Sequence, residues 1–133
     1  MAFDFGMKNI GVAVGQSLTK TASPEATLKA KDGIPDWNDI KTLIDQWQPT
    51  DLVVGLPLNM DGTASESSRR AKKFANRLHD KFNLPTHTFD ERLSTIEAKN
   101  LAETAAKTYG WTRHSIDSIA AALILNNWLN QHS

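Results

Sequence analysis

The sequence contains no cysteine, so neither a disulfide nor a thiolate-bound zinc ion can hold this fold together. A metal site built from oxygen ligands stays open, and nothing excludes a reducing compartment. The chain also lacks an excess of either charge, because fifteen Lys and Arg residues balance fifteen Asp and Glu residues. Any electrostatic attraction to nucleic acid must therefore come from a local patch.

Long apolar runs are missing as well. No stretch reaches the ~20 residues that a membrane helix needs, and the N-terminus shows no basic region followed by a hydrophobic segment. The 133 residues fit the usual size of one domain. We therefore expect a single domain spanning residues 1–133 that is cytoplasmic and has no membrane partner.

Alternating strand and helix patterns predict an α/β fold. Strands are expected at residues 2–6 and 10–15, which form a hairpin, and then at 27–30, 52–56 and 86–90. Helices are expected at residues 37–47, 65–82, 94–108 and 115–129. Strands that alternate with helices pair in parallel through right-handed crossovers. The prediction is a mixed five-stranded sheet, with a three-strand antiparallel meander plus two parallel strands, and helices on both faces.

Three acidic residues stand where a predicted strand ends or a predicted helix begins: Asp4, Glu91 and Asp117. A carboxylate within an apolar run is costly to desolvate, so such residues are usually paired with a partner or with a metal ion. Functional groups in this class of sheet gather outside the carboxyl ends of the parallel strands. The three acids together suggest a divalent-metal site.

Each acid also has a purely structural interpretation. Asp4 can stabilise a loop beside Gly6, and Asp117 can complement a helix dipole. Asp90 and Glu91 are neighbours that face opposite ways if the strand continues through them, so only one is expected to reach an ion. We favour Glu91.

One predicted helix is strongly basic. Six Lys and Arg residues lie between residues 65 and 82, against only Glu66 and Asp80. Such a face is often simply solvated, and contact with a phosphate backbone is the competing interpretation. The residues expected to contact nucleic acid are Arg69, Arg70 and Lys73 on this helix, Lys8 in the first hairpin, and Arg92 beside Glu91. Trp111, in a predicted loop, is the best candidate for stacking on a base.

Five motifs in order resemble a known family. They are Phe3-Asp4-Phe5-Gly6 with the following 10–15, Val54-Gly55-Leu56-Pro57, Asn59-Met60-Asp61-Gly62, Asp90-Glu91-Arg92-Leu93-Ser94-Thr95 and Asp117-Ser118-Ile119-Ala120-Ala121. Together they resemble the YqgF family of RNase H-like proteins, described as candidate Holliday junction resolvases and as nucleases that mature the 5′ end of pre-16S rRNA. The resemblance covers nearly the whole chain and implies an RNase H-like fold. The family's acidic triad falls on Asp4, Glu91 and Asp117.

A phosphodiester can be hydrolysed by two divalent ions about 4 Å apart, which activate a water and relieve charge on the leaving oxygen. Carboxylates are the ligands that Mg²⁺ or Mn²⁺ would take here. In this scheme Asp4 bridges the two ions, and Glu91 and Asp117 each hold one. The interpretation is a metal-dependent nuclease acting on structured nucleic acid, with precursor ribosomal RNA at the 5′ end of 16S as the favoured substrate.

Other functions stay open at this point. Branched DNA is the rival substrate, and a ribosome-assembly module that binds nucleic acid with little catalysis is a further alternative. Residues 4–14 also resemble the first phosphate loop of actin-like ATP-binding proteins. Those proteins need two lobes and a second glycine-rich loop, for which 133 residues leave no room. The choice of RNA or DNA, of Mg²⁺ or Mn²⁺, and the oligomeric state are left open by the sequence.

Overall fold

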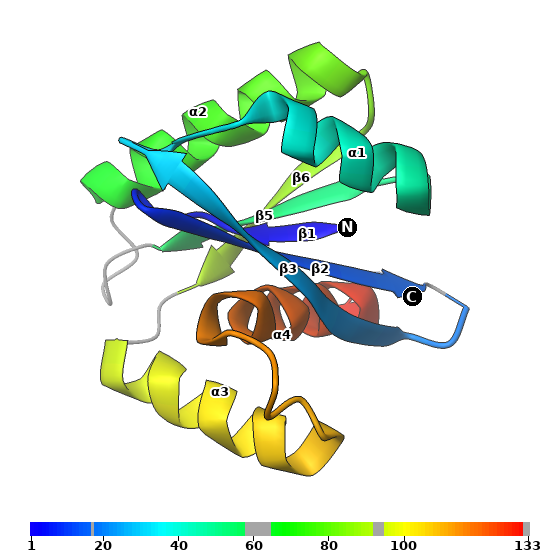
Figure 1. Cartoon of the computed structure of the whole chain (residues 1–133), viewed down its shortest axis with the longest axis vertical. Helices are drawn as coiled ribbons and strands as arrows, with labels where there is room; N and C mark the ends of the chain where they lie inside the picture. Colours follow the sequence, from blue (N-terminus) through cyan, green and yellow to red (C-terminus); the bar gives the residue numbers. More distant parts are fainter. Residues whose placement is uncertain (17, 58–64, 92–94, 132–133) are drawn as a thin grey trace.

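A computed structural model describes residues 1–16, 18–57, 65–91 and 95–131, and at residues 57, 91 and 95–99 it describes the backbone alone. The centre of the molecule is a six-stranded sheet with the order β4-β3-β2-β1-β5-β6 (Figure 1). The strands are β1 (Ala2–Asp4), β2 (Asn9–Gln16), β3 (Thr21–Lys31), β4 (Ile34–Pro35), β5 (Leu52–Pro57) and β6 (Thr86–Glu91). The helices are α1 (Trp37–Trp47), α2 (Glu66–Phe82), α3 (Thr95–Tyr109) and α4 (Ile116–Gln131).

The pairing follows the predicted mixed pattern. β1 pairs antiparallel with β2 and parallel with β5, and β5 pairs parallel with β6. The predicted α/β architecture with an antiparallel meander and two parallel strands is thus confirmed, apart from one additional strand.

The additional strand is β4, which the sequence analysis did not predict. Asp32 and Gly33 both have positive φ, at 52° and 78°, and this tight turn brings Ile34 back against Lys31. Pro35 has no N–H to donate, which suits an edge strand. β3 is also much longer than the predicted 27–30. The prediction was too short because most residues of β3 are at least partly exposed, so the strand shows little apolar alternation in the sequence.

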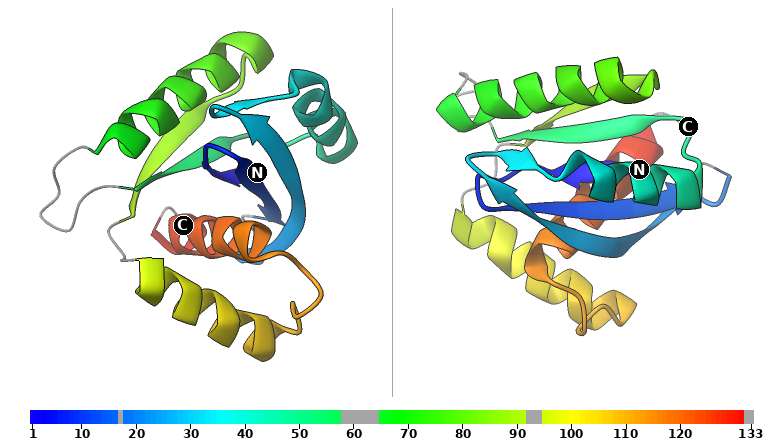
Figure 2. Two further views of the ribbon diagram at one scale, coloured as in Figure 1. Left: turned by 60° about the vertical axis from the view of Figure 1, so that its left-hand side comes forward. Right: turned by 45° about the horizontal axis from the view of Figure 1, so that its top comes forward.

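The helices form layers on both faces of the sheet. α1 and α2 lie on one face, α4 lies on the other, and α3 packs on the outer side of α4 (Figures 1 and 2). α4 is therefore covered on two sides, which explains why its sequence is apolar almost all round. No helix within the described ranges is long and apolar enough to cross a membrane.

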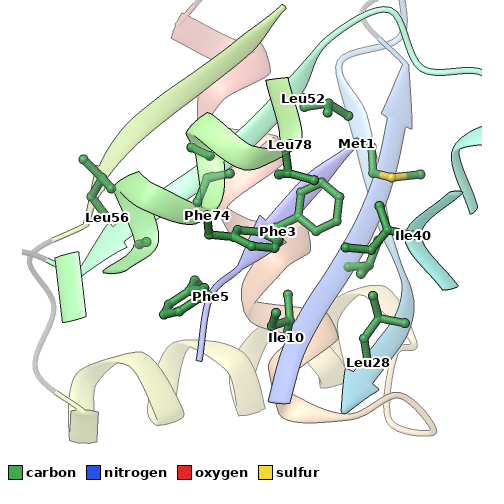
Figure 3. Close-up of a cluster of buried hydrophobic side chains, with 14 residues drawn as sticks. Met1, Phe3, Phe5, Ile10, Leu28, Ile40, Leu52, Leu56, Phe74 and Leu78 are labelled. Carbon is green, nitrogen blue, oxygen red and sulfur yellow. The ribbon is translucent and has the colours of Figure 1, made fainter. Parts of the chain in front are cut away.

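The core between the sheet and α2 is aromatic at its centre. The ring of Phe74 in α2 meets Phe3 of β1 edge to face at 5.6 Å (Figure 3). It also stacks on Trp37 of α1 at 5.7 Å. Phe5, which follows β1, lies 5.5 Å from the same ring. These contacts fix α2 across β1 and so set where the outward side chains of α2 lie.

Serine side chains cap the two helices that matter most for the site. The backbone N–H of Ser68 donates to the Ser65 hydroxyl oxygen at 3.0 Å, and that of Ser118 donates to the Ser115 hydroxyl oxygen at 3.2 Å. Each cap satisfies an N–H that would otherwise lack a partner in the first helical turn. The cap at Ser115 places Asp117 in the first turn of α4.

Candidate active site

Asp4 ends β1, the strand that lies between β2 and β5. Ala2 packs in the cluster beneath α4 and Phe3 in the cluster beneath α2, so strand alternation puts Asp4 on the α4 face, where it is half-buried. Its neighbour on each adjacent strand is a glycine, Gly11 on β2 and Gly55 on β5. Neither neighbour has a side chain, and the backbone of α4 occupies the place that a side chain on Gly11 would take.

Asp117 reaches this place because α4 begins directly on Gly11. A Cβ atom on Gly11 would collide with the backbone carbonyl of Asp117 and would lie 2.8 Å from the backbone nitrogen of Ser118. Since Gly11 is the register partner of Asp4, this close approach brings the first turn of α4 beside the end of β1. Asp117 is half-buried there. Sequence reasoning did not assign Gly11 this role, although the glycine within the apolar run 10–14 was a signal of close backbone approach.

Glu91 is the last residue of β6, across β5 from Asp4. Phe89 lies level with Gly55, and Glu91 is two residues further along, opposite Pro57. Phe89 packs in the α4 cluster, so the alternation of β6 assigns residue 91 to the α4 face and residue 90 to the opposite face. The backbone thus brings the three predicted ligand positions to one end of one face.

The donors present fit a hard divalent cation. Asp4 and Asp117 supply carboxylate oxygens at half-buried positions, and oxygen is the donor that Mg²⁺ and Mn²⁺ favour. Among the side chains that the structure describes, no three His, Asp or Glu residues lie close enough together to hold an ion. Glu91 is outside that set, because only its backbone is described.

The basic residues of α2 line a groove on the other face of the sheet. The groove has a volume of about 460 Å³ and lies between α2 and the β3–β4 turn. It is lined by Phe5, Asp32, Gly33, Ile34, Glu66, Arg69, Arg70, Lys73, Phe74 and Arg77. Three predicted contact residues therefore share one cavity. Sequence reasoning did not select Arg77, although it continues the helical stripe that runs through residues 66, 70 and 73.

The other predicted contact residues are more scattered. Lys8 is exposed in the β1–β2 turn, where its backbone carbonyl accepts a hydrogen bond from the N–H of Ala30 at 2.8 Å. Arg92 and the segment Asn59-Met60-Asp61-Gly62 lie outside the described residues. Trp111 is half-buried and stacks on the exposed ring of Tyr109 at 4.7 Å, which makes it part of the turn between α3 and α4.

A separate polar cluster ties the opposite end of the sheet to α4. The Asp51 carboxylate contacts the His87 ring nitrogen at 2.9 Å, and His87 packs on Trp128 with ring centroids 5.1 Å apart. Burial by itself would raise the pKa of Asp51, but hydrogen bonds from His87 and Thr50 and the charge of His87 outweigh it and lower the pKa below its usual value. His87 thus has a structural partner far along β6 from Glu91.

Comparison with known sequences identifies relatives over nearly the full length. The family described as "RuvX: Holliday junction resolvase" matches residues 1–131. A protein of Saccharophagus degradans named "Putative pre-16S rRNA nuclease" is 54% identical over 132 residues, which cover 99% of this chain and 93% of the relative. A protein of Azotobacter vinelandii with the same name is 51% identical over 129 residues, covering 97% and 91%.

Solved structures share the fold at low identity. RuvC of Thermus thermophilus, in complex with a Holliday junction substrate, has a TM-score of 0.56 at 13% identity, covering 98% of this chain and 92% of that one. The Fowlpox virus resolvase, in complex with Holliday junction DNA, has a TM-score of 0.52 at 12% identity, covering 98% and 95%. These likenesses confirm the RNase H-like fold that the sequence motifs implied.

Proposed function

This chain belongs to the RuvX family of Holliday junction resolvases, and from that premise we propose that it is a metal-dependent nuclease that processes the 5′ end of pre-16S rRNA. The relatives at 54% and 51% identity carry the name of that activity. Such a substrate implies that the protein works in the cytoplasm.

The observation that carries the proposal is the close contact of the Asp117 backbone with Gly11, the register partner of Asp4. Asp4 and Asp117 are more than a hundred positions apart in the sequence, and α4 can approach β2 this closely only because residue 11 has no side chain. Two nearby carboxylates repel each other, so an arrangement that brings Asp117 toward the end of β1 favours a bound cation. A divalent cation removes that repulsion.

In this proposal Asp4, Glu91 and Asp117 would hold the Mg²⁺ or Mn²⁺ ions. When bound, the ions activate the attacking water and stabilise the leaving oxygen. The chain's own residues position the substrate: Arg69, Arg70, Lys73, Lys8 and Arg92 hold phosphates of the nucleic acid.

Branched DNA is the second candidate substrate, because the family that matches residues 1–131 is described by that activity. A resolvase cuts two strands and needs two active sites, whereas trimming one RNA end needs one. An assay that offers both the RNA and the branched DNA therefore distinguishes the two functions.

The test incubates the purified protein with a 5′ pre-16S rRNA fragment and, separately, with a four-way DNA junction, each with Mn²⁺ or with EDTA. We expect cleavage of the RNA only with the metal, and loss of cleavage in Asp4→Asn, Glu91→Gln and Asp117→Asn. Glu103→Gln, which removes an exposed carboxylate from α3, is the matched control and should cleave normally.

Cleavage of the junction instead of the RNA would show that branched DNA is the substrate and would leave the assignment of the metal ligands unchanged. Wild-type turnover in all three site variants would refute the assignment of the ligands. Circular dichroism of each variant is needed as well, because Asp117 also complements the dipole of α4 and its loss is expected to cost about 0.3 to 1 kcal/mol of stability.

A further inference from the structure

The family assignment does not say what the groove between α2 and the β3–β4 turn binds. We propose that this groove holds the backbone of the same nucleic-acid strand that is cut, about three nucleotides from the scissile phosphate. The proposal rests on the proposed nuclease function. It adds a second contact region, on the face of the sheet opposite the carboxylates, and it includes Arg77.

The position of the groove follows from consecutive residues of the chain. Asp4 lies on the α4 face, and the next residue, Phe5, packs with Phe3 and Phe74 on the α2 face (Figure 3). There its ring forms part of the groove lining. The groove and the acidic residues therefore meet at the same end of β1. Side chains on the two faces of one strand reach positions on the order of 10 Å apart, and a stacked strand spans that distance in about three nucleotides.

The walls of the groove are fixed by the backbone. The N–H of Gly33 donates to the carbonyl of Met7 at 2.9 Å, which ties the β3–β4 turn to the β1–β2 turn that carries Lys8. A Cβ atom on Gly33 would lie 2.7 Å from the Phe5 ring, so the turn packs tightly on the floor. The cationic side chains that line the groove thus stand opposite a preformed wall, and Arg69, Arg70 and Lys73 stay exposed to a ligand.

The charge of the groove suits a phosphate backbone. Four cationic side chains line it, on α2 at positions 69, 70, 73 and 77, against the two carboxylates of Asp32 and Glu66. Arg70 is partly engaged by Glu66, at 3.3 Å, which leaves the other three cations as the main contacts. The floor contributed by Phe5 and Phe74 is apolar, so sugars and bases can lie against it without losing hydrogen bonds.

The other flank of α2 provides the contrast. Lys72 faces a different groove, between α2 and β6, that also contains Asp80 and two histidines. A general attraction between the basic helix and nucleic acid would involve both flanks equally. A backbone site in the first groove would involve only one, and that difference can be measured.

The experiment measures binding without catalysis. Fluorescence anisotropy follows a labelled single-stranded oligouridylate of about 12 nucleotides in EDTA, at several salt concentrations, with the full chain. For Arg69→Gln/Lys73→Gln/Arg77→Gln we expect the log-log salt slope to fall by about 2, since each lost contact with a single strand removes about 0.7. The matched control Lys41→Gln/Lys72→Gln/Lys107→Gln removes the same charge elsewhere and should keep the wild-type slope.

Strand length gives a second measurement. Affinity of the wild type should rise as the oligonucleotide grows from about 4 to about 8 nucleotides, because the longer strand reaches both faces, and the groove variant should lose most of that rise. Equal changes of slope in the groove and control variants would overturn the proposal, because only net charge would then matter. A groove variant with unchanged RNA affinity and altered sedimentation would overturn it in favour of an interface between copies of the chain.

The two proposals fail in different ways. Binding in EDTA does not depend on metal ligands, so a wild type that binds through the groove but cuts neither substrate would refute the nuclease and leave the groove standing. A groove variant that cuts RNA as efficiently as the wild type would refute the groove and leave the nuclease standing.

Discussion

Replacing Gly11 with alanine tests the link between folding and catalysis most directly. The new methyl group would collide with the carbonyl of Asp117 and would stand 2.8 Å from the nitrogen of Ser118, where ordinary contacts are 3.4 to 4 Å. All the atoms it meets belong to the backbone of α4, so no side chain can rotate away. The first turn of α4 must therefore move off β2, taking Asp117 with it.

The size of the effect follows from this displacement. Restoring normal contact with the Asp117 carbonyl needs a shift of more than about 1 Å, and a misplacement of even about 1 Å at a catalytic group can reduce the rate about 100-fold. Forcing an extra methyl group into a packed core costs about 1 to 3 kcal/mol of unfolding free energy. Gly11→Ala is thus expected to fold, to melt at a lower temperature, and to lose most of its cleavage activity.

The assay compares cleavage rates at limiting Mn²⁺ with the free energy of unfolding in urea. Gly110→Ala is the matched control: Gly110 has φ of 74° with nothing within 4 Å, so alanine there costs about 1 to 2 kcal/mol of backbone strain without moving α4. The two variants should lose similar stability, and only Gly11→Ala should lose activity. Wild-type turnover in Gly11→Ala would show that the contact between Gly11 and α4 does not position a catalytic group.

Three further outcomes are expected. Asp90→Asn should slow cleavage less than Glu91→Gln, because residue 90 lies on the α2 face of β6. Steady-state cleavage rates test this, and a larger loss in Asp90→Asn would show that Asp90 and not Glu91 is the ligand. Mn²⁺ at a hundred times its Kd should stabilise the wild type by about 2.7 kcal/mol, and equal melting shifts in Asp4→Asn would contradict the site. The stability that Asp51 contributes should be fully present above its unfolded pKa of about 4 and be lost as pH falls through its lowered folded pKa. Asp51→Asn cannot lose this contribution, so its free energy of unfolding in urea should fall less steeply with decreasing pH than that of the wild type. A parallel decline would show that the contact with His87 adds no stability.

The positions of the carboxylates on the chain could be predicted because each stands at the end of a strand or helix that the apolar pattern marks clearly. β4 could not, since a two-residue strand made by the turn at Asp32 and Gly33 has no periodicity of its own. The role of Gly11 could not be predicted either, because it depends on which helix packs over β2. The groove was visible in the sequence only as a basic stripe, and its second wall comes from the β3–β4 turn and Ile34, some thirty residues earlier.

The placement of α3 outside α4 has a consequence for hydrogen exchange. α3 covers α4 and adds no strand pairing to the sheet, whereas Asp117 is held by the contact of α4 with Gly11, and Glu91 by the pairing of β6 with β5. Helices with a single packing partner open at lower free energy than those enclosed on two sides. The amides of α3 should therefore exchange with solvent well before those of α4, so that the part of the chain between two proposed ligands can unfold locally while both remain in register.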